Sequence, residues 1–193
     1  MEKFVNNNLC LYFSPEELET IYKVKDLYLK ALLIIIELYK NAQDKEGKPY
    51  IGHLIRVSNK LDELVERVAG LLHDTIEDTK VTYNDLIEIG FPKEIVDIVL
   101  LVTNKNIESN YLSRDEKLQI YYDKIDSIIN SGNIHAIRLK EADMSDNYNA
   151  DRIYYLPIES QVWAHDKYRV PLQRLRKKIN EITKEMALRM TIS

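Results

Sequence analysis

The segment 71–79 (Leu-Leu-His-Asp-Thr-Ile-Glu-Asp-Thr) limits what this chain can fold into more than any other stretch. It places a histidine and three carboxylates within six residues, directly after an apolar run. If the segment is helical, His73 and Glu77 lie four residues apart, as do Asp74 and Asp78, so each pair shares one helix face. One pair could hold a metal ion, and the other could bind water just beyond it.

The composition is that of a globular protein with a sizeable core. The 193 residues are 45% hydrophobic and 30% charged, which suits one domain. A net charge of -4 argues against duplex nucleic acid as the main partner. The single Cys10 excludes an internal disulfide framework and a cysteine metal cluster, and it fits a reducing cytosol. The first residues lack a signal-peptide pattern, and the longest apolar run, residues 31–36, is too short to span a membrane. We therefore expect a cytoplasmic protein.

The pattern of the chain predicts helices throughout. Glycine and proline number only five each, so turns are few. Ser14-Pro15-Glu16-Glu17 is a good helix start, with a cap, a first-turn proline and acidic residues at the positive end of the dipole. We expect helices over residues 14–41, 50–60, 63–77, 82–89, 92–103, 114–130, 134–146 and from about 156 to 190. The apolar face of the first should comprise Leu18, Ile21, Leu29, Leu32, Leu33 and Ile36.

No strand, internal repeat or low-complexity tract is evident. The predicted fold class is all-α, a single helical bundle of about eight to ten helices. It would span residues 1–193 with its core at about 14–190. Residues 1–13 would be a loosely attached arm, and residues 104–110 a polar loop.

Two histidines and two carboxylates form a candidate metal site. His73 and Asp74 are adjacent, so both can reach one ion only if the helix end is tightly packed, which Gly70 would allow. His53 and Asp143 would complete a set with positions left for water, as in hydrolytic Mn²⁺, Fe²⁺ or Zn²⁺ centres. Taken singly, a histidine such as His53 is more often a hydrogen-bonded core residue than a ligand, and an aspartate such as Asp143 is more often a cap or an ion-pair partner.

These motifs occur in the order of a known family. Four segments carry the resemblance: 47–53 is similar to G-x-P-Y-I-x-H, 69–79 to A-x-L-L-H-D-x-x-E-D-T, 91–103 to a helix ending in V-x-x-[LV]-T, and 139–147 to V-K-L-A-D-x-x-x-N. The chain thus resembles the HD superfamily of metal-dependent phosphohydrolases, and within it the RelA/SpoT-type alarmone hydrolases. The resemblance covers about residues 25–180 and no synthetase or regulatory portion, as in stand-alone, metazoan SpoT homologue-like hydrolases.

The resemblance implies roles for individual residues. His53, His73, Asp74 and Asp143 would bind one Mn²⁺, with Fe²⁺ or Zn²⁺ as alternatives. Glu77 and Asp78 would position and activate the attacking water, and Asn147 would contact the nucleotide. The family reaction removes pyrophosphate from the 3′ position of (p)ppGpp to give GDP or GTP. A bare structural role for Glu77-Asp78 is less favourable, because negative charge at a helix C-terminus opposes the dipole.

Some positions depart from the family pattern. The usual Arg-Lys pair before the G-x-P-Y-I-x-H segment corresponds to Ala42-Gln43, and the usual proline after the metal-binding histidine is Leu54. The basic-Thr pair after Asn147 is replaced by Asn149-Ala150. Replacement contacts to substrate phosphates could come from Lys105, Arg114, Lys117, Lys140 or the cluster Lys167-Tyr168-Arg169. Tyr168 resembles a family position near the site, whereas Tyr50 is expected to pack in the core.

These departures keep several functions open. The partner is expected to be a small nucleotide: a guanosine alarmone, or alternatively ppApp, the 2′-phosphate of NADPH or a 3′-pyrophosphorylated RNA end. A different class is a metal-binding nucleotide sensor, or a neutralising partner of a toxic alarmone synthetase. A homodimer is a further open alternative.

Overall fold

The computed structural model describes residues 8–104 and 111–192, and every described element is a helix. The predicted all-α class is therefore confirmed over this part of the chain. Residues 1–7 of the expected arm, and residues 105–110 of the expected polar loop with Lys105, lie outside the described residues. Across the described ranges, no helix has both the length and the apolar character that crossing a bilayer requires.

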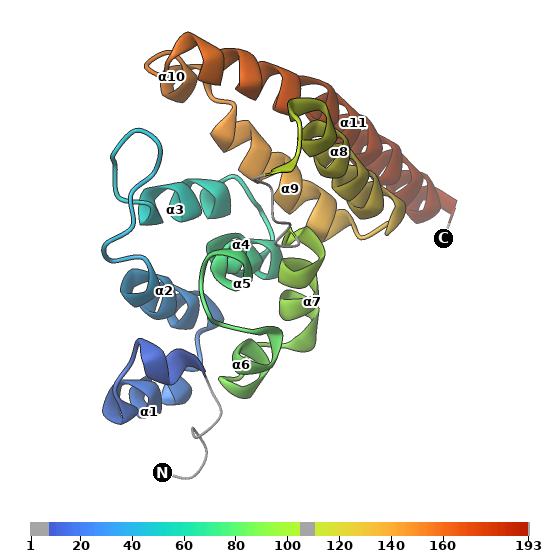
Figure 1. The fold of residues 1–193 in the computed structure, drawn as a ribbon. Coiled ribbons are helices and arrows are strands. Elements are labelled where there is room, and N and C mark those ends of the chain that lie inside the picture. Colours follow the sequence, from blue (N-terminus) through green and yellow to red (C-terminus); the bar gives the residue numbers. More distant parts are fainter. Residues whose placement is uncertain (1–7, 105–110, 193) are drawn as a thin grey trace. The chain divides into compact units, whose positions relative to one another are not determined.

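The chain divides into two compact units, residues 1–105 and 106–193, and each is described by itself. In its described residues, the first unit contains a 3₁₀ helix, η2 (Asn8–Leu11), and seven α-helices. The α-helices are α1 (Pro15–Lys23), α2 (Leu27–Leu38), α3 (Ile51–Asn59), α4 (Leu64–Leu72), α5 (Thr75–Asp78), α6 (Tyr83–Glu88) and α7 (Lys93–Val102). Helix α4 is central, since α2, α3 and α7 all pack against it (Figure 1).

The predicted first helix is two helices. The cap of Ser14 and Glu17 is confirmed, but α1 ends at Lys23. A second helix then starts at Asp26, whose side chain accepts a 2.8 Å hydrogen bond from the backbone NH of Leu29. The expectation of one helix to residue 41 was wrong because this internal cap carries neither glycine nor proline.

The break also changes which apolar residues of α2 are buried. Leu29 and Ile36, expected on the apolar face, are 48% and 51% exposed. Ala31, Ile34 and Ile35 are buried instead. The non-helical residues between α1 and α2 reset the helical phase, so a periodicity counted from α1 assigns the wrong face of α2.

The described part of the expected arm is firmly attached. Leu9 in η2 is fully buried, and Phe13 is 7% exposed. The backbone NH and side-chain amide of Asn8 donate hydrogen bonds of 3.0 and 2.8 Å to the carboxylate of Asp85. Asp85 also caps the start of α6 through Thr82. The prediction of a loose arm is therefore wrong for residues 8–13.

The second unit is built from α8 (Arg114–Asn130), α9 (Ile134–Asn147), α10 (Ala150–Ile153) and α11 (Ile158–Ile192). Helices α8, α9 and α11 pack against one another, as Figure 1 shows. The predicted bounds of α8 and α9 are confirmed to within one residue, whereas the short α10 was not predicted. Helix α11 continues through Pro171, which lacks the NH that an uninterrupted helix would use there.

Candidate metal and water-binding site

The predicted helix over residues 63–77 breaks at the histidine-aspartate pair. Helix α4 ends at Leu72 and α5 begins at Thr75. Two side chains form hydrogen bonds with the last carbonyl groups of α4. The Thr75 hydroxyl donates to Leu72 O at 2.7 Å, and His73 Nδ1 lies 2.8 Å from Gly70 O. Because these groups satisfy the helix end, the chain can turn at Asp74 (φ −96°, ψ −5°) and start a new helix.

The break between α4 and α5 affects the two residue pairs that were predicted to share a helix face. The backbone NH groups of Glu77 and Asp78 both bond to Asp74 O, at 3.1 and 2.8 Å. Asp74 and Asp78 are therefore one helical turn apart, as expected. His73 and Glu77 belong to separate helices, so the prediction that they share one continuous helix face was wrong.

His53 reaches His73 because α3 and α4 approach closely. A Cβ added to Gly70 would lie 3.0 Å from Leu61 Cδ1 and 3.1 Å from the Cα of Ser58, so the contact requires glycine. This confirms the expected role of Gly70. The rings of His53 and His73 are both buried, their centroids are 5.3 Å apart, and they offer ligand atoms within 4.8 Å of each other.

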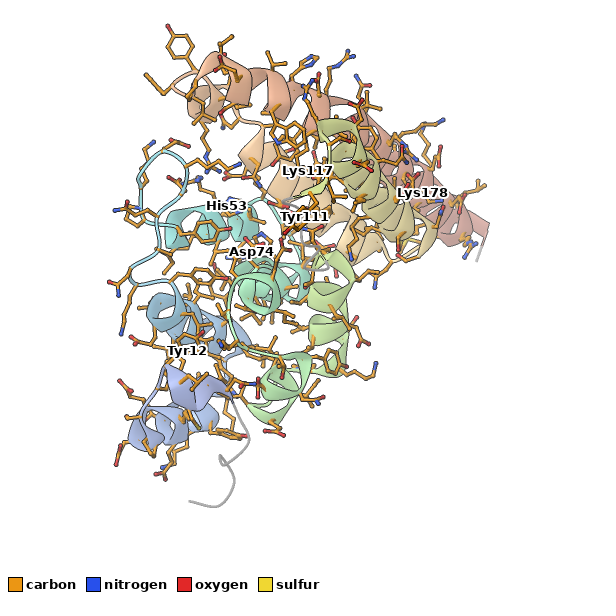
Figure 2. All side chains as sticks on the ribbon, viewed as in Figure 1. Tyr12, His53, Asp74, Tyr111, Lys117 and Lys178 are labelled. Carbon is orange, nitrogen blue, oxygen red and sulfur yellow. The ribbon has the colours of Figure 1, made fainter. Side chains whose placement is uncertain are left out.

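Asp74 brings a carboxylate to the two imidazoles. Its Oδ2 atom lies 3.1 Å from His73 Nε2 and 3.8 Å from His53 Nε2. Figure 2 shows His53 on α3 and Asp74 just beyond the end of α4. The Asp74 side chain is 18% exposed, so the cluster lies at the edge of the buried interior.

The hydrogen bond of His73 selects the tautomer that a metal ligand needs. The Gly70 carbonyl only accepts, so Nδ1 carries the proton and Nε2 presents its lone pair on the side of Asp74. Two imidazoles and a carboxylate are donors that Mn²⁺, Fe²⁺ and Zn²⁺ accept. The residues present in the first unit thus fit a divalent transition metal.

Tyr50 does more than pack in the core. Its hydroxyl donates a 2.5 Å hydrogen bond to Asp74 Oδ2, and its ring stacks on Tyr39 with centroids 5.2 Å apart. Burial, and then the charge of Asp74, raise the pKa of Tyr50 well above its ordinary value, so the phenol stays a donor. The expectation of core packing alone was incomplete for this half-buried residue.

Asn104 holds Glu77 in place. Its backbone NH donates to Glu77 Oε2 at 2.8 Å, and its side-chain amide contacts Oε1 and Oε2 at 3.1 and 2.9 Å. The sequence reasoning missed this partner. The one indication in the sequence was that Asn104 directly follows Val102-Thr103, the end of a motif that resembles the family pattern.

Asp78 is the more solvent-exposed carboxylate of the pair. Partial removal of its carboxyl group from water, together with the charges of Asp74 and Glu77, raises the pKa of Asp78 to about 6. A carboxylate with a pKa near working pH is a better proton acceptor than an ordinary aspartate.

Asp143 lies on α9 in the second unit and is buried. Its Oδ2 accepts a 2.8 Å hydrogen bond from Lys140 Nζ, and its Oδ1 accepts one of 2.6 Å from the Asn147 amide. The three predicted residues thus share one face of α9, at spacings of three and four. This arrangement orients both carboxylate oxygens of Asp143.

Tyr168 belongs to an aromatic and cationic cluster in the same unit. Its ring centroid lies 6.1 Å from those of Tyr121 and Tyr148. The Lys167 ammonium lies 4.4 Å from the ring centroid of Tyr121 and 5.2 Å from that of Tyr168. Sequence reasoning named Lys167 and Tyr168 as site candidates but not Tyr121.

Two other expected phosphate-binding residues differ in their surroundings. Arg114 forms an ion pair with Asp166 and lies over the ring of Trp163. Its positive charge is therefore already paired within the second unit. Lys117 lies in the first turns of α8, and its role remains a prediction.

Comparison with known proteins agrees with this geometry. No family model matches the chain. A solved structure of a metazoan SpoT orthologue, described as hydrolysing ppGpp, matches with a TM-score of 0.59 and 22% identity, over 86% of this chain and 98% of that one. At this identity the match shows the fold, and with the His/His/Asp donor cluster it defines the class: an all-α HD-type domain.

Two curated relatives define the chain further. It is 34% identical over 158 residues to a probable guanosine-3′,5′-bis(diphosphate) 3′-pyrophosphohydrolase of Mycoplasma pneumoniae, over 77% of this chain. It is 35% identical over 128 residues to a GTP pyrophosphokinase of Myxococcus xanthus, over 63% of this chain. The matches span only 20% and 17% of those proteins. The chain is therefore a homologue of SpoT/RelA-type (p)ppGpp hydrolases, similar to about a fifth of their length.

Proposed function

We propose that this protein removes pyrophosphate from the 3′ position of guanosine alarmones, giving GDP from ppGpp and GTP from pppGpp. The observation that carries the proposal is the convergence of His53, His73 and Asp74 one helical turn before Glu77-Asp78. The similarity to a probable 3′-pyrophosphohydrolase supports the same chemistry.

A single divalent ion, Mn²⁺ by the family resemblance and Fe²⁺ or Zn²⁺ as alternatives, would be held by His53, His73, Asp74 and Asp143. When bound, such an ion would neutralise phosphate charge and favour the deprotonated form of water. Asp143 enters this set as a proposal. It is supported by the resemblance of its segment and by the way Lys140 and Asn147 orient its carboxylate.

The carboxylates of Glu77 and Asp78 would have different roles toward the attacking water molecule. Glu77 has both oxygens engaged by Asn104, which fixes its orientation and suits it to position the water. Asp78 is more exposed and has the raised pKa, which suits it to accept the proton. The water oxygen would bond to the phosphorus attached to the 3′ oxygen. The bond between that phosphorus and the 3′ oxygen would break, and the leaving oxygen would gain a proton.

Substrate contacts would come from the second unit. Asn147 and Lys140 offer an amide and an ammonium beside Asp143, and Tyr168 belongs to a group of rings lined by Lys167. Neighbouring aromatic and cationic side chains suit a nucleobase with attached phosphates. We assign Asn147, Lys140 and Tyr168 to nucleotide binding on this chemistry.

An HD hydrolase of another nucleotide is the second candidate. Asn149, which stands where the family usually has a basic residue, uses its side chain to accept a 2.9 Å hydrogen bond from the NH of Asp151 at the start of α10. Asn149 thus caps a helix where the family usually has a positive charge. This favours a different way of recognising the base or the phosphates of the substrate. The candidates are ppApp, the 2′-phosphate of NADPH and a 3′-pyrophosphorylated RNA end.

A substrate panel tests the proposal. The Mn²⁺-loaded protein is incubated with ppGpp, pppGpp, ppApp, NADPH and a 3′-pyrophosphorylated RNA, and products are separated by ion-exchange chromatography. We expect the highest kcat/KM for ppGpp and pppGpp. A higher kcat/KM for another member would replace the guanosine assignment. Tight binding of ppGpp without turnover would instead favour a sensor or a neutralising partner of an alarmone synthetase.

A further inference from the structure

Helix α2 is apolar on both of its faces. Only Lys30 and Glu37 are charged among its twelve residues. One face, which includes Ala31, Ile34 and Ile35, is buried in the first unit, where α2 packs against α1 and α4. A helix that is hydrophobic all round is normally buried all round. The other face of α2 therefore calls for an explanation.

That second face consists of Leu29, Leu32, Leu33 and Ile36, which we call the outer stripe of α2. The spacing i, i+3, i+4, i+7 places the four side chains in one row along the helix. Leu29 and Ile36, at its two ends, are 48% and 51% exposed, and Leu32 and Leu33 are half-buried. A contiguous apolar surface of this kind, unlike a single exposed leucine, indicates contact with another apolar surface.

The neighbouring helix α1 shows what an ordinary outer face looks like in the same unit. Its buried residues are Leu18 and Ile21, and its exposed residues include Glu16, Glu19 and Lys23. Such charged residues are what a helix normally presents to water. The apolar outer stripe is therefore a property of α2 and not of the first unit as a whole.

Each end of the outer stripe carries one acidic and one basic residue. Lys25 and Asp26 precede its first residue, whereas Glu37 and Lys40, which form an ion pair, follow its last. The charges balance, so the stripe lacks the basic border that favours an anionic membrane surface. A second copy of α2 running in the opposite direction would match both ends, because Lys25 would meet Glu37 and Asp26 would meet Lys40. The helix dipoles would also be opposed.

We propose that the outer stripe is the interface of a homodimer, in which the α2 helices of two copies pack antiparallel about a twofold axis. Leu29 of one copy lies against Ile36 of the other, and Leu32 lies against Leu33, so each contact occurs twice. One pair of short helices makes a small interface, and the dimer therefore forms reversibly at micromolar concentrations. This inference goes beyond the proposed hydrolase function and does not depend on it.

The first test is sedimentation velocity of the full chain over a range of micromolar concentrations. The mass of the wild type should rise with concentration from 22.7 kDa toward twice that value. Leu29→Lys and Ile36→Glu should each keep the mass of one chain, because each would bury an unpaired charge in the interface. The matched control is Leu100→Lys, which changes a leucine of α7 that is also 48% exposed and should dimerise like the wild type.

The second test mixes the two single variants in equal amounts. Leu29→Lys and Ile36→Glu place opposite charges at facing positions of an antiparallel pair, so the mixture should recover the dimer that each variant alone has lost. A mixture that stays monomeric would overturn the antiparallel register. Circular dichroism and urea midpoints like those of the wild type show that the variants are folded.

Two results would overturn the dimer itself. One is a wild type that keeps the mass of one chain at every concentration, and the other is wild-type dimerisation in folded Leu29→Lys. A monomeric wild type that cosediments with vesicles of phosphatidylcholine and phosphatidylserine would assign the outer stripe to a membrane surface instead.

Discussion

The Tyr50 hydroxyl donates a 2.5 Å hydrogen bond to Oδ2 of Asp74, the oxygen that lies 3.1 Å from His73 Nε2. The bond connects two segments that are 24 residues apart in the sequence. It orients the Asp74 carboxylate, which lies beside both imidazoles. The co-occurrence of P-Y-I-x-H and H-D in one chain therefore has a physical reason, because the tyrosine of the first motif orients the aspartate of the second.

Removing this hydroxyl should weaken metal binding. Tyr50→Phe keeps the stack on Tyr39 and loses the bond to Asp74, and loss of a partner that orients a metal ligand typically costs 10- to 100-fold in affinity. We expect Mn²⁺ affinity, measured by isothermal titration calorimetry, to fall by about tenfold or more. Tyr111→Phe is the control, since Tyr111 is 89% exposed. Equal Mn²⁺ affinity in wild type and Tyr50→Phe would show that Asp74 needs no such support.

The contact between Asn104 and Glu77 should affect turnover rather than metal binding. Asn104→Ala removes the side-chain amide that contacts both oxygens of Glu77, so we expect kcat for ppGpp to fall by roughly tenfold. Asn104→Asp places a second negative charge there and should reduce kcat further. Both variants should bind Mn²⁺ like the wild type. A change confined to KM would instead assign Asn104 to substrate binding.

Activity should decline in acid because of Asp78. Its pKa is raised to about 6, and a protonated carboxyl cannot accept a proton from water. The plot of log kcat/KM against pH should therefore fall with unit slope below about pH 6, or below a lower pH when a bound cation favours the carboxylate. Asp78→Asn should lose activity at every pH. An acidic limb above pH 7, or residual activity in Asp78→Asn with the wild-type profile, would assign the proton transfer to another group.

The close contact at Gly70 should couple stability to the site. In Gly70→Ala the new Cβ would meet the Ser58 backbone at 3.1 Å, and we expect a loss of about 1–3 kcal/mol in the free energy of unfolding by urea. Mn²⁺ affinity should fall as His53 and His73 are pushed apart. Gly52→Ala is the helical control for stability, because its Cβ would meet only the flexible end of Arg56 at 3.3 Å. Equal urea midpoints for both variants would contradict this account of the α3–α4 contact.

The sequence predicted the helices whose ends carry local signals. Helices α8 and α9 begin at Ser113 and Asn133 caps and end near Gly132 and the polar residues after Asn147, so their bounds followed from local chemistry. The break before Asp26 escaped prediction because it carries neither glycine nor proline: α1 ends at Lys23, and the Asp26 side chain caps the start of α2. The His73–Asp74 turn also lacks glycine and proline, and the side chains of His73 and Thr75 satisfy the last carbonyls of α4.

The donor types of the site were predictable, and their supporting contacts were not. His53, His73 and Asp74 stand in motifs that resemble those of a known family, and that resemblance implied their chemistry. Asn104 lies 27 residues from Glu77. Its position has no pattern of its own, because the contact depends on packing that no local spacing encodes.

The most direct test of the central claim is the product analysis of ppGpp incubated with the metal-depleted protein before and after Mn²⁺ is restored, for the wild type and for Asp74→Asn. We predict GDP and pyrophosphate in equal amounts from the wild type only with the metal, and a rate at least about a hundredfold lower for Asp74→Asn. Undiminished hydrolysis in excess chelator, or a wild-type rate in Asp74→Asn, would contradict the account.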